Sequence, residues 1–378
     1  MLFAVFVSLG LHFYIGSRLG PALPPTAGLA LALLLAASAI LMPLGLMARR
    51  VRSRALADRL TWAGMLCMGL FSSLLVLTLL RDALLLMAWV VDGWFTGLPW
   101  AQWRQVSAQA VPLLALAATA IGLLNARRTA RVVHVDVPLP QLTPALAGLR
   151  IVQISDIHVG PTIKARYLAA IVDAVNRLEP DIVAITGDLV DGSVAELAAH
   201  VAPLARLRAR HGSFFVTGNH EYYSGVEGWV AELRRLGVRV LHNEHVVLEH
   251  DGARLVLAGV TDFSGGHFDA RHASDPVAAA RGAPAGLTKV LLAHQPRSAP
   301  AAARAGFDLQ LSGHTHGGQF LPWSFFVRLQ QPFTAGLHAL DGLLVYVSRG
   351  TGYWGPPKRL GAPSEITQLR LAAKPAAP

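Results

Sequence analysis

The chain has 378 residues, of which 53% are hydrophobic, and it carries a formal net charge of +10. That charge is uneven: residues 1–131 hold 11 arginines and three acids, whereas residues 132–378 carry an excess of only two positive charges. The distribution argues against a nucleic-acid-binding domain, because most of the excess lies between apolar stretches rather than on the polar part of the chain. The one cysteine, Cys67, excludes an intrachain disulfide framework and a multi-thiolate metal site.

The first third of the chain predicts a helical membrane domain over residues 1–131. A bilayer core requires about 20 predominantly apolar residues in a helix, and four stretches approach or reach that length. They cover residues 2–16, 28–48, 61–80 and 106–124. The first is shorter and contains His12, but it lacks a basic leading segment and a small-residue cleavage site. We therefore expect a retained span rather than a signal peptide.

Arginines in the connections predict the orientation of these spans. Five follow the second stretch and three follow the fourth: Arg49, Arg50, Arg52, Arg54 and Arg59, then Arg127, Arg128 and Arg131. Basic loops of membrane proteins face the cytoplasm. We therefore expect a multi-pass protein of the bacterial inner membrane with both termini, and so the large C-terminal domain, in the cytoplasm.

Residues 83–91 allow two interpretations. They are apolar, but Arg81 and Asp82 separate them from the third stretch. We expect a separate interfacial helix with its tryptophans at headgroup level. The alternative is a longer, tilted third span with a buried Arg81–Asp82 pair, which would imply a function inside the membrane.

The remainder of the chain predicts an α/β domain. We expect a linker over residues 132–146, the domain over 147–371 and a tail over 372–378. Short runs rich in Val, Ile, Leu or Phe predict buried strands in LRIVQISD, DIVAITGD, SFFVTGN, RLVLAGV, KVLLAH, FDLQLSGH and LLVYVS. Between the first three runs, residues 166–178 and 195–210 are compatible with helices. This alternation indicates helices packed on sheets.

Five of the seven runs end on residues that can bind a metal. These residues are Asp156, His158, Asp188, Asn219, His220, His294, His314 and His316. Loops converge and ligands bind at the carboxyl ends of such strands. Mixed imidazole, carboxylate and amide ligands suit a pair of transition-metal ions, which one carboxylate can bridge at about 3.5–4 Å. Ligands two residues apart, as in DxH and HTH, leave a strand on the same face, so the pattern predicts a dinuclear metal site.

The ordered motifs SDIH, GDLVD, GNHE, LLAH and GHTH resemble those of the calcineurin-like metallophosphoesterase superfamily. The trailing strings GHTHGGQ, SRGTGYWGPP and PSEI are similar to its membrane-anchored bacterial branch. The resemblance implies a four-layer αββα sandwich that binds two divalent ions (manganese, iron or zinc). It assigns the first ion to Asp156, His158, Asp188 and His316, and the second to Asp188, Asn219, His294 and His314. It also implies that His220 contacts the scissile phosphate and protonates the leaving group, and that Asp191 orients that region.

This resemblance implies a metal-dependent hydrolase that attacks a phosphodiester or pyrophosphate with a metal-bound hydroxide. Because the domain would be held at the membrane, we expect a lipid-linked phosphate ester as substrate and membrane lipids as surroundings. We expect no nucleic acid and infer no specific protein partner. Two alternatives remain: a cyclic nucleotide or nucleotide phosphodiesterase that the spans merely localise, and a non-catalytic metal-binding sensor.

Three features outside the metal motifs stay open. Residues 320–329 (FLPWSFFVRL) could form a rim for acyl chains or a helix that packs in the core. His267 could contact substrate, since its loop follows an apolar strand. Arg349 could bind a phosphate or pair with an acid in the core.

Overall fold

The computed structural model describes residues 2–92 and 97–374. It divides into two compact units, each of which is described by itself. The first comprises Met1–Asn125 together with Gly355–Lys358, and the second comprises Ala126–Trp354 and Arg359–Pro378.

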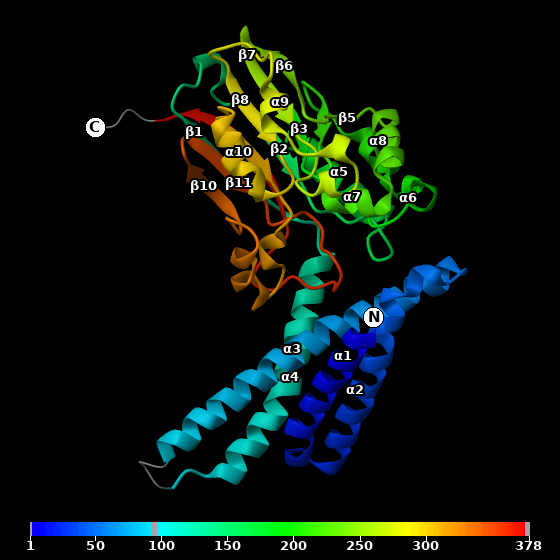
Figure 1. The fold of residues 1–378 in the computed structure, drawn as a ribbon. Helices are drawn as coiled ribbons and strands as arrows, with labels where there is room; N and C mark the ends of the chain where they lie inside the picture. The colour runs from blue at the N-terminus through cyan, green and yellow to red at the C-terminus, as the bar shows by residue number, and fades with distance from the viewer. Residues whose placement is uncertain (1, 93–96, 375–378) are drawn as a thin grey trace. The chain divides into compact units, whose positions relative to one another are not determined.

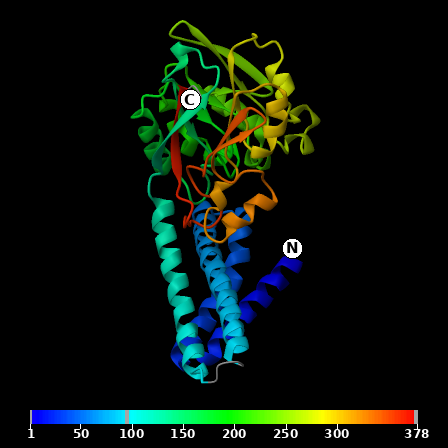
Figure 2. The same ribbon diagram turned by 90° about the vertical axis from the view of Figure 1, so that its left-hand side faces the viewer.

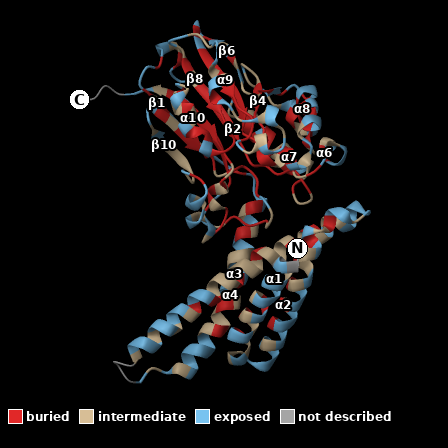
Figure 3. Ribbon diagram, in the orientation of Figure 1, coloured by how far each residue is buried: buried red, intermediate tan, exposed pale blue. Residues whose placement is uncertain are grey.

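The first unit is helical. Its helices are α1 (Leu2–Leu19), α2 (Pro25–Leu46), α3 (Arg54–Asp92) and α4 (Trp100–Arg127), with short 3₁₀ turns at Gly20–Ala22 and Ala48–Arg50 (Figures 1 and 2). A small core joins α1 through Ile15, α2 through Leu35, α3 through Leu74 and α4 through Ala108. Most of the other apolar side chains are partly or fully exposed (Figure 3), as expected for helices that face lipid.

Within the described residues, α2, α3 and α4 are long and apolar enough to cross a membrane. The span predicted over residues 2–16 forms α1, which is not among these three helices. Membrane association of the chain therefore rests on α2, α3 and α4.

The expectation of a separate interfacial helix over residues 83–91 is wrong. These residues continue α3 without a break, and α3 runs for 39 residues. The helix passes through Arg81 and Asp82 because these side chains are paired: Arg81 Nη1 lies 3.0 Å from Asp82 Oδ1. The segment is also rich in Leu, Met and Ala, which favour a helix.

The second unit contains two six-stranded sheets. In spatial order the first holds β1 (Arg131–Leu139), β12 (Glu365–Ala373), β2 (Arg150–Ile154), β3 (Ile182–Ile185), β4 (Ser213–Phe215) and β5 (Arg239–Val240). The second holds β10 (Gly336–Leu340), β11 (Leu343–Val347), β9 (Leu309–Ser312), β8 (Thr288–Leu292), β7 (Ala253–Gly259) and β6 (Glu244–His250). The helices are α5 (Ala165–Asn176), α6 (Val194–Val201), α7 (Asn219–Ser224), α8 (Val226–Arg235), α9 (Pro276–Ala280) and α10 (Ala299–Arg304).

Three buried apolar layers hold the helices and sheets together. Ile151 of β2 packs between the two sheets, whereas its neighbour Val152 packs against the helix layer of α5, α6 and α8. On the outer face of the second sheet, Leu291 of β8 packs with residues of α9 and α10. All seven apolar runs noted in the sequence form strands. Their sequences are continuously apolar because these strands are buried on both faces. The result is the four-layer αββα sandwich.

Residues 132–146, expected as a linker, do not form one. Most of β1 lies there, and β1 pairs in parallel with β12 along Arg131–Leu139. The sequence RVVHVDVPL alternates apolar and polar side chains, as a half-buried edge strand does. Its partner β12 extends into the expected tail at 372–378, of which residues 375–378 lie outside the described part of the chain.

Candidate metal centre

Parallel pairing brings the polar strand ends together. In the first sheet β2 pairs with β3 so that Ile154 lies opposite Ile185, and Asp156 and Asp188 follow directly. In the second sheet β8 pairs with β9 so that Leu292 lies opposite Leu311, and His294 and His314 follow. Both sheets therefore present candidate ligands at the carboxyl ends of their strands.

The backbone at these positions is unusual. Five candidate ligands, Asp156, His158, Asp188, His314 and His316, adopt φ values between 50° and 71°. This left-handed region is uncommon for residues other than glycine, and such strain concentrates at functional sites. The conformation turns the chain sharply where each strand ends and directs neighbouring side chains into one space.

Two glycines permit close approach of the loops. A Cβ at Gly218 would collide with the Asp188 carboxylate, and a Cβ at Gly313 would collide with Ser155 Oγ and Asp156 Oδ2. Neither position can therefore carry a side chain without displacing an acidic candidate ligand.

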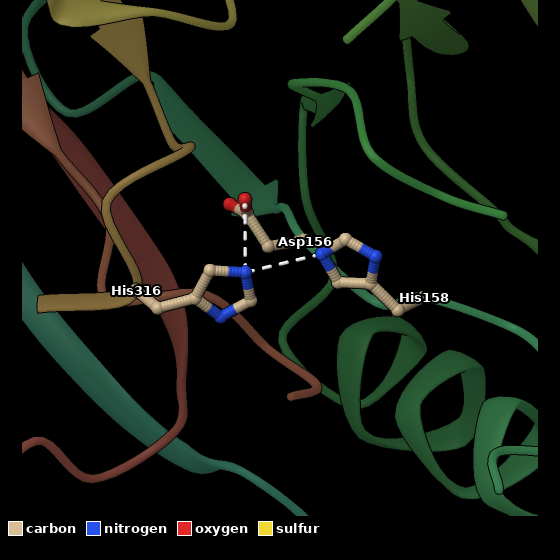
Figure 4. A group of neighbouring side chains, drawn as sticks. All are labelled: Asp156, His158 and His316. Atoms are coloured by element: carbon tan, nitrogen blue, oxygen red, sulfur yellow. Dashed lines mark hydrogen bonds and ion pairs between the residues drawn. The ribbon is translucent and has the colours of Figure 1, made fainter. Parts of the chain in front are cut away.

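One cluster joins Asp156, His158 and His316, whose candidate ligand atoms lie within 4.8 Å of one another. Figure 4 shows the three side chains pointing toward a common centre. His158 Nε2 lies 3.1 Å from His316 Nε2, and His316 Nε2 lies 3.5 Å from Asp156 Oδ1. All three side chains are buried or nearly so, which suits a cation held out of solvent.

A second cluster joins Asp188, His294 and His314. His294 Nε2 lies 3.2 Å both from Asp188 Oδ2 and from His314 Nδ1. The other ring nitrogen of His294 lies 2.7 Å from the Thr186 carbonyl, which can only accept a hydrogen bond. His294 Nδ1 is therefore the donor, and in the neutral ring the Nε2 lone pair faces the cluster.

Asn219 supplies an independent sign of a missing ligand. Its side chain is buried and its Oδ1 atom has no hydrogen-bond partner. An unpaired buried carbonyl oxygen is costly unless a cation or water satisfies it. Asp188 links the clusters, because its Oδ2 atom also lies 3.9 Å from His158 Nε2. The donor set thus fits divalent metal binding, and Asp188 lies within reach of both clusters.

The pKa values of these groups reflect their burial and their proximity to one another. Burial lowers the pKa of His314 to about 3 and that of His316 well below its ordinary value, so both rings are neutral at pH 7 and keep a lone pair. Burial opposes ionisation of Asp188, but the neighbouring His294 outweighs it and holds the Asp188 pKa well below its usual range. The pKa of His294 moves upward for the same reason: burial lowers it, and the charge of Asp188 raises it more strongly.

His220 and Asp191 form a pair beside the clusters. His220 Nδ1 lies 2.5 Å from Asp191 Oδ1, which also lies 3.2 Å from His158 Nδ1. The same carboxylate oxygen therefore orients a candidate ligand and the candidate acid. Burial lowers the pKa of His220, but its hydrogen bond to Asp191 and the charge of Asp188 raise it to about 9.

Glu221 is a site residue for which the sequence analysis offered no role. Its buried carboxylate accepts hydrogen bonds from the main-chain N–H groups of Gly218, Asp188 and Leu189, at 2.6, 3.0 and 2.8 Å. These bonds fasten the loop after β3 to the start of α7. The signal was present in GNHE, because Glu221 is the third residue after Gly218 and so occupies the capping-box position of the helix.

Arg359 was also missed. It is fully buried, and it donates to the main-chain carbonyls of His316 and Arg349 at 2.9 and 2.7 Å. A second guanidinium nitrogen lies 3.1 Å from His316 Nδ1. Arg359 therefore fixes the loop that carries His316, and no pattern near residue 359 indicated this long-range contact.

The three open features have different outcomes. Arg349 pairs with the buried Glu365, with Nη1 2.8 Å from Oε2, as in the core-pairing alternative. His267 lies in a short 3₁₀ turn, Gly265–His267, and the structure assigns it no role. Of residues 320–329, Phe320 is buried, but residues 321–329 do not form a helix in the core. They form two short 3₁₀ turns with exposed apolar side chains, here called the apolar rim: Leu321, Trp323, Phe325, Phe326 and Leu329.

These features define a candidate metal site built from histidine and aspartate side chains, and comparisons with known proteins show the family to which it belongs. The calcineurin-like phosphoesterase family model matches residues 149–318. An uncharacterized metallophosphoesterase of Aquifex aeolicus is 35% identical over 233 residues, covering 61% of this chain and 88% of that protein. The chain therefore belongs to the calcineurin-like metallophosphoesterase family.

Two further similarities extend the comparison. A Bos taurus protein named "Transmembrane protein with metallophosphoesterase domain" is 45% identical over 280 residues, covering 70% of this chain and 63% of the relative. The chain thus spans less than two thirds of that relative's length. Among solved structures, the NAD nucleotidase of Haemophilus influenzae matches with a TM-score of 0.39 and 18% identity, covering 54% of this chain and 50% of that chain.

Proposed function

We propose that the chain hydrolyses a lipid-linked phosphodiester or pyrophosphate at a dinuclear metal centre. The observation that carries the proposal is the surroundings of His220. Its ring lies against the half-exposed Trp354 and against Tyr223, at centroid distances of 5.6 and 5.3 Å. The candidate acid thus lies beside apolar surface on a chain that also has membrane-crossing helices.

His220 is suited to protonate the leaving group. The Asp191 carboxylate accepts from Nδ1–H, which leaves Nε2–H to donate. With a pKa of about 9, the ring holds this proton at pH 7. When bound, two divalent ions would neutralise phosphate oxygens and lower the pKa of water. Asp156, His158, Asp188 and His316 would hold one ion, and Asp188, Asn219, His294 and His314 the other.

The apolar rim supports the choice of a lipid-linked substrate. Leu329 and Phe325 expose 84% and 73% of their surface, which is unusual for side chains of this kind in a polar domain. The rim begins two residues after Gln319, and Gln319 exchanges two hydrogen bonds of 2.9 Å with the main chain of Trp354. The rim and the aromatic side chain at His220 are thereby joined through one glutamine.

The proposal places the hydrolytic domain on the cytoplasmic face of a bacterial inner membrane. Its basis is the arginine-rich segments at residues 49–59 and 127–131. A phosphatase reporter that is active only in the periplasm, fused after residue 131, should remain in the cytoplasm and be inactive, and phosphatase activity would contradict this orientation.

The test measures kcat/KM of the full-length protein in detergent for two substrates: a lipid-linked pyrophosphate in mixed micelles and a water-soluble diester. Replacing two rim residues, Trp323→Ser with Phe326→Ser, should lower kcat/KM for the lipid substrate about tenfold, because apolar contact area is lost. Turnover of the soluble diester should not change. Val277→Ser, at an exposed apolar position on α9, is the matched control.

The outcomes separate the competing functions. If the rim substitutions changed kcat/KM by the same factor for both substrates, or for neither, the lipid assignment would be contradicted and a nucleotide or cyclic nucleotide phosphodiesterase would be favoured. No metal-dependent turnover of either substrate by wild type would contradict hydrolysis and favour the metal-binding sensor.

A further inference from the structure

The helical unit contains a charged cavity that the hydrolytic site does not use. The cavity has a volume of about 480 Å³ and is lined by residues of α1, α3 and α4 and of the turn after α1. Its described lining includes three arginines, one acid and two tryptophans: Arg18, Arg81, Arg104, Asp82, Trp89 and Trp100. Charged residues within membrane helices are costly and mark functional sites.

A single carboxylate pairs with two of these arginines. Asp82 Oδ2 lies 2.7 Å from Arg18 Nε and accepts a hydrogen bond of 2.6 Å from the Tyr14 hydroxyl. Asp82 Oδ1 lies 3.0 Å from Arg81 Nη1. Three guanidinium groups against one carboxylate leave two positive charges in excess among the described lining residues. Such an excess of positive charge around a cavity favours an anionic ligand.

Arg81 is held in place by hydrogen bonds and does not point into solvent. Arg81 is only 7% exposed; it donates from Nε to Ser107 Oγ at 2.9 Å and from Nη2 to the Arg104 carbonyl at 3.2 Å. Arg104 itself is exposed and lines the cavity. The cavity thus combines one fixed guanidinium with an accessible one, a combination suited to a phosphate group.

An apolar groove adjoins the charged cavity. It has a volume of about 550 Å³, lies between α3 and α4, and shares Arg81 and Leu85 with the charged cavity. The rest of its described lining is mostly apolar and includes Leu77, Leu80, Leu84, Val106 and Leu114. A phosphate site and an apolar groove thus meet at Arg81, which matches a molecule with a charged head and an acyl chain.

We propose that the helical unit binds an anionic phospholipid, with its phosphate among Arg18, Arg81 and Arg104 and an acyl chain in the apolar groove. Arg104 lies about 30 Å along α4 from Asn125, at about 1.5 Å per residue, close to the thickness of a bilayer core. The ligand therefore belongs to the leaflet opposite the one that holds the C-terminal end of α4. This lipid site is distinct from the metal centre and does not rest on the proposed hydrolysis.

The test measures lipid binding to full-length protein purified in detergent and treated with a chelator, so that metals cannot hold phosphate. Native mass spectrometry would compare phosphatidylglycerol, phosphatidylcholine with the same acyl chains, and inorganic phosphate. Arg104→Gln should weaken phosphatidylglycerol binding about tenfold, the loss expected for one charge-assisted contact. Arg104→Glu should weaken it further, because the charge is reversed. Arg52→Gln, an exposed arginine before α3, is the matched control and should bind as wild type does.

Selective binding of phosphatidylglycerol that is lost in both Arg104 variants, but retained in Arg52→Gln, would support the site. Equal binding of the two lipids would overturn it. Binding of inorganic phosphate at the same affinity as phosphatidylglycerol would also overturn it, because the acyl groove would then contribute nothing. Elution profiles and thermal unfolding of each variant would show that the helices remain folded, since Arg104 is exposed and its side chain is not needed in the core.

Discussion

Each unit of the molecule contains a cluster of charged side chains. The cluster in the metal centre lacks positive charge, whereas the cluster in the helical unit lacks negative charge. In the metal centre, Asp156 and Asp188 lie among imidazoles, two of which are neutral at pH 7, and His220 and His294 have raised pKa values. The protons on those two rings provide positive charge that bound metal ions would otherwise supply. In the helical unit, three arginines and one carboxylate line a cavity, and two of these arginines pair with the carboxylate. The excess charge of each cluster thus indicates the charge of its ligand: cations in the first case and an anion in the second.

Removing the charge of Asp188 should have the largest effect, because this carboxylate is common to both clusters. We expect Asp188→Asn to lower hydrolysis about a thousandfold, since bound metal ions contribute several kcal/mol to the reaction. The metal content of the purified variant should fall in parallel. Asp173→Asn, an exposed acid on α5, is the control and should leave both quantities unchanged. Full activity of Asp188→Asn would contradict the assigned centre.

Replacing Glu221 should have a smaller effect, and on stability as well as on activity. Glu221→Gln places an amide N–H₂ among three main-chain N–H groups and removes one acceptor, so we expect a loss of about 1–3 kcal/mol in unfolding free energy. Thermal unfolding of the chelator-treated protein would measure it. Glu249→Gln, at an exposed position of β6, should change stability little. An equal loss in the two variants would show that the buried position of Glu221 is unimportant.

The smallest expected effect is a pH dependence of stability, which reports on the proton that His220 carries when no metal ion is bound. The pKa of His220 in the folded protein is about 9, above the ordinary 6.5, so its stabilising contribution is complete below pH 6.5 and is lost as the pH rises through about 9. In the chelator-treated protein, the difference in unfolding midpoint between wild type and His220→Gln should shrink by a few degrees over that range.

The exposed His134 on β1 offers the control for the pH test, because it lies outside the metal centre and His134→Gln should change the unfolding midpoint little. If the midpoint difference for His220→Gln were constant from pH 6.5 to 10, the raised pKa of this residue would be refuted.

The sequence alone determined the class of fold and the identity of the candidate ligands. The seven buried strands could be predicted because strands covered on both faces have continuously apolar sequences. The polar residues at their ends could be recognised because the apolar runs stop abruptly. The assignment of individual ligands to one ion or the other, and the role of His220, remain predictions that the geometry accommodates. The apolar stretches were equally legible, because a bilayer imposes a minimum length on them.

Only the tertiary structure decided the contacts between distant residues. The expectation of a linker over residues 132–146 is wrong because the partner of β1, β12, lies more than 200 residues away in the sequence. The alternating pattern of β1 is compatible with a strand, but only the pairing with β12 makes it one. The roles of Glu221 and Arg359 depend on main-chain groups brought close by folding, which no local pattern encodes. The helix break expected at Arg81 and Asp82 failed for the same reason: Arg18, Tyr14 and Ser107, from two other helices, satisfy the pair and allow α3 to continue.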